Sequence, residues 1–192
     1  VWFTEEAATE DYWINLSDNY RFLKDGRLLW WSEREGVGNF YLFDGSNWTR
    51  VTDRAEPVIG LTGVDQDAGR IYYQGVENVL ERHIYAAPLE GGAETRLTEA
   101  GFVHSAVMDK DAQTLLVSRS APDQPPQSYL ADTDGDRLAW VEENALDADH
   151  PYAPYLASHV MPQYGTIPAE DGTPLHYMML KPEMEPGKQY PV

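Results

Sequence analysis

One turn-and-strand unit recurs along the 192-residue chain, and it constrains the fold more than any other feature. Each copy is a short apolar segment led in by a turn. The copies start at residues 26, 69 and 113, so they are 43 and 44 residues apart. They read Gly26–Trp31, Gly69–Gln74 and Gln113–Ser118. A repeat of this length made of short strands is typical of β-propeller blades, so the period predicts an all-β propeller segment.

A second strand returns at nearly the same interval, which argues against a chance match. Trp48–Thr52 is followed 46 residues later by Glu94–Thr98, with the same turn-strand order around it. We therefore expect residues 1–144 to be a partial propeller of about three blades plus part of a fourth. The expected blade units cover residues 19–62, 63–107 and 108–144.

The strands expected within these units differ in character. Leu28–Trp31 is apolar on both faces, which predicts a buried central strand. Pro57–Thr62 and Phe102–Met108 are expected to close the first and second units. Ala121–Pro126 is polar and rich in proline, which predicts a loop. Ahead of the first unit, two further strands are expected at Val1–Phe3 and Tyr12–Leu16.

The composition and the strand pattern of the sequence change after residue 144. Ala145–Ser158 is rich in Asp, Pro and Ala, and it predicts a linker with one short helical turn. Gln163–Ile167 and Leu175–Leu180 flank an Asp-Gly turn, which is typical of a β-hairpin. We assign residues 145–192 to a linker and the first strands of another domain. Because the chain opens without methionine and closes where a strand begins, we expect it to be an excerpt of a longer protein.

Composition narrows the classes of partner. The net charge of −18 argues against nucleic acid and against anionic membrane surfaces as partners, because both attract basic proteins. The absence of cysteine excludes disulfides and thiolate metal sites. No apolar run approaches the ~20 residues of a membrane span. The 12 tyrosines and 6 tryptophans favour β-structure.

Several motifs together resemble the dipeptidyl peptidase IV family, whose members are α/β-hydrolase serine peptidases with an N-terminal propeller. The resemblance rests on their order along nearly the whole chain. The motifs are Phe22–Gly26, Ser32–Gly36, Phe40–Leu42, Gly165–Ile167, Glu170–Leu175, Tyr177–Pro182 and Tyr190–Val192. It implies that the chain runs from the propeller up to the start of an α/β-hydrolase domain, which is absent from this sequence.

The resemblance also implies a function for the parent protein. It would be a periplasmic or secreted serine exopeptidase that removes dipeptides from peptide amino termini. Its propeller would admit extended peptides and exclude folded proteins. The implied partners are a peptide substrate and the protein's own hydrolase domain. The family's amine-binding glutamates lie before the matched region, and Glu5-Glu6 and Glu142-Glu143 are interpreted as solvated charges.

By the same resemblance, Trp13, Asn15 and Asp18 are the candidates to touch substrate. They lie in Tyr12–Asp18, which matches a blade end that faces the hydrolase in the family. The alternative for Trp13 is a tryptophan packed at a blade edge.

A search for chemistry finds no catalytic residue, metal site or cofactor motif in this segment. No serine has glycine at both −2 and +2, as a nucleophile elbow requires. The five histidines lack zinc-ligand spacing, so His83 and His104 are interpreted as structural. Asp132–Asp136 lacks the glycine spacing of a calcium loop and predicts a turn. Gly36–Gly38 is followed by no lysine, so it is not a phosphate loop.

Two other functions stay open at this point. The chain could belong to a non-enzymatic propeller that serves as a protein-binding scaffold. It could also be the propeller of a sister acylaminoacyl peptidase or oligopeptidase. In every case, a propeller cut between blades leaves apolar faces and strand edges uncovered, so we expect self-association.

Overall fold

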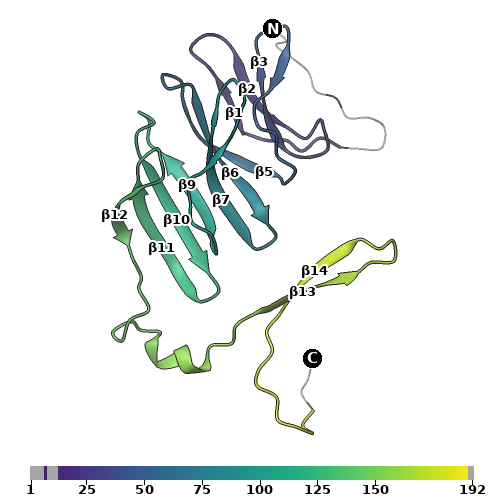
Figure 1. Cartoon of the computed structure of the whole chain (residues 1–192), viewed down its shortest axis with the longest axis vertical. Coiled ribbons are helices and arrows are strands. Elements are labelled where there is room, and N and C mark those ends of the chain that lie inside the picture. Colours follow the sequence, from purple (N-terminus) through teal and green to yellow (C-terminus); the bar gives the residue numbers. More distant parts are fainter. Residues whose placement is uncertain (1–6, 8–12, 190–192) are drawn as a thin grey trace. The chain divides into compact units, whose positions relative to one another are not determined.

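The structure is a computed structural model that describes residue 7 and residues 13–189. The expected strand Val1–Phe3 lies outside these residues. The regular elements of the described chain are strands, labelled β1 to β14, together with one short 3-10 helix, η1 (Figure 1). The chain divides into two compact units: residues 1–120 with 127–143, and residues 121–126 with 144–192.

The first sheet has four antiparallel strands in chain order. The predicted central strand is confirmed, because β2 is paired on both sides and its Leu29 is fully buried. The neighbouring β3 is buried along its whole length. The strands are β1 (Tyr20–Phe22), β2 (Leu28–Ser32), β3 (Asn39–Phe43) and β4 (Trp48–Arg50).

The next eight strands form two similar groups of four. They are β5 (Val58–Asp65), β6 (Arg70–Asn78), β7 (Glu81–Pro88), β8 (Thr95–Arg96), β9 (Val103–Met108), β10 (Leu115–Ala121), β11 (Gln124–Ala131) and β12 (Arg137–Glu142). We call β5–β8 the second sheet and β9–β12 the third sheet. They are joined by a parallel pair, Arg82 with Val103.

Two expected strands pair with strands of the next sheet and not with those of the unit they were expected to close. Pro57–Thr62 was expected to close the first unit, yet it forms part of β5, which pairs with β6. Phe102–Met108 likewise supplies β9, which pairs along its length with β10. The fourth strand of the first sheet is instead the short strand β1, which pairs with β2. The period was therefore informative, but it did not indicate which neighbour each strand joins.

The prediction of a loop at Ala121–Pro126 is wrong. Strand β10 extends to Ala121 and β11 begins at Gln124, so a tight turn replaces the loop. Proline fits here because the ladder with β12 starts only at Ser128, after the two prolines. On that side, the Pro126 carbonyl instead accepts the Asn144 side chain at 2.9 Å.

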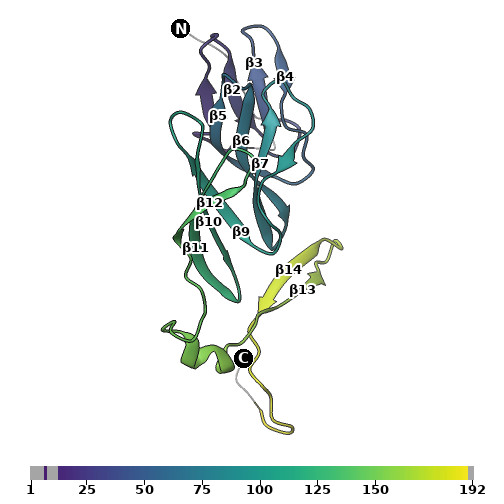
Figure 2. The ribbon, with the colours of Figure 1, turned by 60° about the vertical axis from the view of Figure 1, so that its left-hand side comes forward.

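The main core lies between the first and second sheets. Side chains of β2 and β3 pack against those of β6 and β7, and the aromatic ring of Tyr73 stacks on Tyr85 at 5.6 Å. A smaller core belongs to the third sheet and includes a contact between Tyr129 and Trp140. Figure 2 shows the strands of the first sheet beside those of the second. The buried members of the main core are Leu23, Leu29, Phe40, Leu42, Val51, Val58, Ile71, Tyr73, Tyr85, Ala87 and Leu89.

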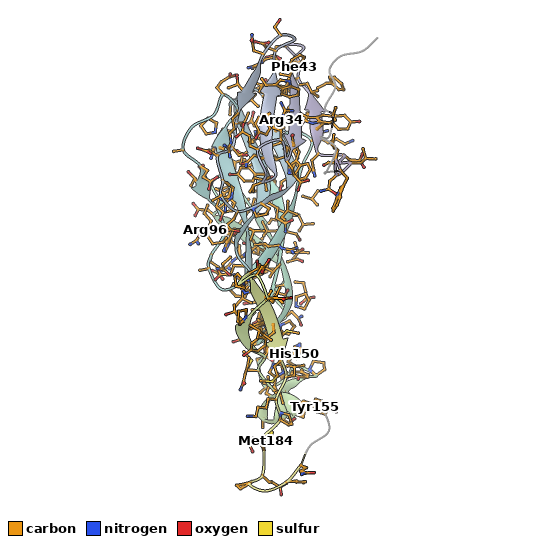
Figure 3. The ribbon with its side chains drawn as sticks, turned by 90° about the vertical axis from the view of Figure 1, so that its right-hand side faces the viewer. Arg34, Phe43, Arg96, His150, Tyr155 and Met184 are labelled. Carbon is orange, nitrogen blue, oxygen red and sulfur yellow. The ribbon has the colours of Figure 1, made fainter. Side chains whose placement is uncertain are left out.

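The second unit contains the expected short helical turn and hairpin, both of which are confirmed. The 3-10 helix η1 covers Ala153–Ser158, and β13 (Gln163–Pro168) pairs with β14 (Pro174–Met179). Gly172 closes the hairpin with a φ of +85°, which favours glycine. Figure 3 marks His150, whose Nε2–H donates to the Asn144 side chain at 2.9 Å. No helix among the described residues is long and apolar enough to cross a membrane.

Candidate functional site

Two of the three predicted site residues are hydrogen-bonded to each other. The indole Nε1–H of Trp13 donates to the Asn15 side-chain oxygen at 3.3 Å. The Asn15 amide nitrogen in turn donates to a Glu33 carboxylate oxygen at 2.5 Å. We call this set the Trp13–Asn15–Glu33 chain. It joins the segment before β1 to the turn after β2.

Trp13 is presented to solvent and is not packed. Its side chain is 81% exposed, so the alternative of a tryptophan buried at a blade edge is wrong. The expected strand Tyr12–Leu16 is also not formed at Trp13–Leu16, and Tyr12 lies outside the described residues. Asp18 is exposed, and within residues 13–189 no hydrogen bond or ring contact links it to Trp13 or Asn15. The role predicted for these residues stays a prediction.

The far end of the segment is fixed by Asn19. Its backbone carbonyl accepts the Trp31 amide of β2 at 3.1 Å. Its side chain accepts the Leu61 amide at 3.0 Å and donates to the Ile59 carbonyl at 3.4 Å, both in β5. Asn19 therefore ties the segment to the first and second sheets at once. The segment has two attachments, one at Asn19 and one at Glu33.

Glu33 is itself held by its turn. Its backbone carbonyl accepts the Gly36 amide at 2.8 Å, and Gly36 adopts a φ of +91°. The preceding Ser32 is buried, and its hydroxyl accepts the Arg34 amide at 3.0 Å. Figure 3 marks Arg34, whose guanidinium lies over the rings of Tyr41 and Trp48 in the first sheet. The turn therefore holds the Glu33 backbone, from which the carboxylate extends, in a defined conformation.

The same kind of attachment recurs in the other sheets. In each case a side chain of the segment before a sheet forms a hydrogen bond or an ion pair with a residue near the hairpin between that sheet's second and third strands. The pairs are Asn15 with Glu33, Arg54 with Glu77, and Glu99 with Arg119. The recurrence places the Trp13–Asn15–Glu33 chain at a structurally defined end of the first sheet.

Arg54 forms the most buried charged cluster in the described residues. Its side chain is 8% exposed, it pairs with Glu94, and its guanidinium stacks over the Tyr85 ring at 4.1 Å. The hydroxyls of Tyr73 and Tyr85 donate to Glu94 and Glu77. Burial first, and the accepting carboxylates second, raise the pKa of both phenols, that of Tyr85 to about 12. The phenols stay protonated donors, so this cluster fixes structure.

His83 and His104 are both fully buried, as expected of structural histidines, with ring centroids 5.2 Å apart. The Nδ1–H of His104 donates to the Arg82 carbonyl at 3.1 Å, and its Nε2 meets no partner among the described residues. Burial above all, together with smaller contributions from the neighbouring His83 and Arg119, lowers the pKa of His104 to about 4. His83 contacts the Glu81 carboxylate at 3.0 Å. This pair lies beside the junction of the second and third sheets.

Glu33 and Arg54 are the residues that sequence reasoning missed. Glu33 lies in the Ser32–Gly36 motif, which contributed only to the family resemblance. Its partner Asn15 lies 18 residues earlier in the sequence. Asp132–Asp136 forms the predicted turn, with Asp132 Oδ1 accepting two backbone amides. Within residues 13–189, no three histidine or acidic side chains are placed to hold a metal ion.

Comparison with known proteins identifies the family. The family model for the dipeptidyl peptidase IV (DPP IV) N-terminal region matches residues 3–126. The fold resembles the crystal structure of dipeptidyl peptidase 4 from Porphyromonas gingivalis, with a TM-score of 0.77 and 23% identity over 90% of this chain and 25% of that one. It also resembles a protein assigned as a dipeptidyl aminopeptidase IV from Bacteroides ovatus, with a TM-score of 0.69 and 24% identity over 86% of this chain and 26% of that one.

These likenesses concern part of each matched structure, because the chain spans about a quarter of their length. At such identities they show the fold, and the family model shows the relationship. The all-β propeller segment expected from the period is confirmed. Since the model matches more than half of the residues, the chain belongs to the dipeptidyl peptidase IV N-terminal region family.

Proposed function

We propose that this chain is the non-catalytic propeller part of a serine exopeptidase that releases dipeptides from the amino termini of peptides. The observation that carries the proposal is the family match over residues 3–126. The sequence itself contains no Gly-x-Ser-x-Gly, so the nucleophile belongs to another part of the parent protein. In this proposal residues 1–144 form part of the propeller, and residues 145–192 lead into the hydrolase domain.

The propeller's role would be to gate peptide access and to shape the substrate cavity. Trp13, Asn15 and Asp18 would touch the substrate. The exposure of the Trp13 indole and the hydrogen bond that holds it to Asn15 support this role, since a binding surface needs accessible but oriented groups. The parent enzyme would act in the periplasm or outside the cell.

Two kinds of protein partner complete the proposal. The hydrolase domain would continue from the β13–β14 hairpin, whose apolar Ile167 and Leu175 are more than half exposed. Isolated copies of the chain would self-associate through the third sheet, where Val107 and Val141 are each at least 60% exposed. Light scattering tests the second statement, and a compact monomer at micromolar concentration would contradict it.

Activity measurements test the enzymatic proposal. We expect the product of the complete gene to release p-nitroaniline from Ala-Pro-p-nitroanilide, and residues 1–192 alone to release none. An N-acetylated form of the same substrate separates the candidates, because an exopeptidase that needs a free amino terminus leaves it intact. Release of p-nitroaniline from only the acetylated form would favour the sister oligopeptidase, because an acylaminoacyl peptidase would remove the acetylated alanine and leave the p-nitroanilide bond intact. A complete product that cleaves neither would favour a binding scaffold.

A further inference from the structure

The side-chain amide of Asn15 has an unambiguous orientation. The indole N–H of Trp13 can only donate, so the atom 3.3 Å from it must be the Asn15 oxygen. An ionised carboxylate can only accept, so the atom 2.5 Å from Glu33 must be the Asn15 nitrogen. The two neighbours agree on one orientation, and the flipped amide would face like groups on both sides.

Among the described residues, this orientation leaves Asn15 with unused hydrogen-bonding capacity. A primary amide has two N–H donors and two acceptor lone pairs, and the bonds of the Trp13–Asn15–Glu33 chain use one of each. The remaining donor and acceptor match the N–H and C=O of a peptide backbone. The neighbouring Trp13 indole, 81% exposed, offers a flat apolar surface beside them. The group as a whole suits an extended peptide.

We propose that Glu33 is a positioning residue for peptide substrate, which orients the Asn15 amide and, through it, the Trp13 indole. The inference rests on the proposed function, and it adds a residue and a role to it. Glu33 suits this role because the turn closed by Gly36 fixes its backbone, while Asn19 fixes the other end of the segment. Asn15 is held between these two fixed points, and Trp13, two residues before it, is held only through its bond to Asn15; neither residue lies in a strand.

Without the Glu33 carboxylate, the Asn15 amide keeps only the Trp13 indole as a partner, and that indole lies on the same irregular segment, so neither group is bonded to the turn after β2. Peptide would then have to order the amide and the indole on binding, which lowers affinity and leaves the chemistry unchanged. A glutamine at position 33 restores a hydrogen-bond acceptor for the Asn15 amide. Glu33→Gln should therefore retain most of the positioning of Asn15 and Trp13. Glu35 lies in the same turn but pairs with Arg50 at 2.7 Å, so Glu35→Ala is a matched control.

The test uses the full-length enzyme and the Ala-Pro-p-nitroanilide substrate. We expect Glu33→Ala to raise KM about fivefold, the equivalent of one hydrogen bond, with kcat within about twofold. Glu33→Gln and Glu35→Ala should stay near the wild-type KM. Nitrogen-15 NMR of residues 1–192 should show shifted Trp13 indole and Asn15 amide resonances in Glu33→Ala and not in Glu35→Ala.

The outcomes separate the two proposals. Wild-type enzyme without dipeptidyl peptidase activity would overturn the proposed function, and this inference with it. An active wild type whose KM is unchanged by Glu33→Ala would overturn the inference alone. An equal rise of KM in Glu35→Ala would also overturn it, because the effect would then belong to the turn in general. Unmoved Trp13 and Asn15 resonances in Glu33→Ala would refute the positioning role directly.

Discussion

Mild acid should destabilise the propeller segment through one histidine, His104. Its ring is fully buried, its Nδ1–H is donated to the Arg82 carbonyl, and its Nε2 has no partner among residues 13–189. A second proton would have to sit on Nε2, where no acceptor meets it. Around the ring, His83 and Arg119 also disfavour the charge, while Glu81 and the Arg82 carbonyl favour it less strongly than burial opposes it.

The sign and size follow from the two pKa values. In the unfolded chain the imidazole has its ordinary pKa of 6.5, whereas in the folded chain the pKa of His104 is about 4. Between these values the unfolded state binds the proton and the folded state does not, so stability falls as the pH falls. From pH 7.5 to pH 5 the linkage amounts to about 2 kcal/mol of unfolding free energy.

Urea unfolding followed by tryptophan fluorescence measures this loss. His104→Gln removes the titrating group while keeping a donor for the Arg82 carbonyl, so this variant should lose about 2 kcal/mol less than wild type between the two pH values. His176→Gln is the control, because that histidine is exposed on β14. The carboxylates with lowered pKa values, such as Asp25 and Glu81, lose their contribution only at lower pH. An equal loss in wild type and His104→Gln would refute the reasoning.

Two further substitutions test the packing of the sheets, with urea midpoints as the readout. Arg54→Met should cost about 3 kcal/mol, because it leaves the partly buried Glu94 without its cation, and a loss below about 1 kcal/mol would contradict that reading. Gly135→Ala should cost at least about 2 kcal/mol, because φ is +91° and the new Cβ would lie 2.4 Å from the Leu97 carbonyl oxygen. Gly26→Ala has a similar φ of +89° but open space around it, so it should cost clearly less, and equal losses would show that the contact is relieved elsewhere.

The sequence predicted the strands better than their partners. Leu28–Trp31 could be identified as a central strand because a strand buried on both faces must be apolar throughout. Pro57–Thr62 could not be placed, because the same pattern allows a strand to join the sheet before it or after it. Pro125 and Pro126 looked like a loop because proline disfavours a ladder, yet the ladder with β12 begins only beyond them.

The candidate site was predictable in part for a related reason. Trp13 and Asn15 came from the family resemblance, which points to a stretch of chain. Glu33 was not predictable as their partner, because the contact depends on the path of a segment without regular structure. Propensity and periodicity describe strands, and they carry little information on such a path. The resemblance left open whether Trp13 is presented for contact or packed at a blade edge, and the structure shows it exposed.

The strand order also bears on how the chain folds. Within each sheet every strand pairs with the strand next to it in the chain, so the loops that must close are short. Such local pairing favours fast folding, which is unusual for an all-β protein. Each sheet's own pairing therefore needs no residue downstream of that sheet and can form while the rest of the chain is still being synthesised. The Arg82–Val103 pair must come later, since it needs the start of the third sheet.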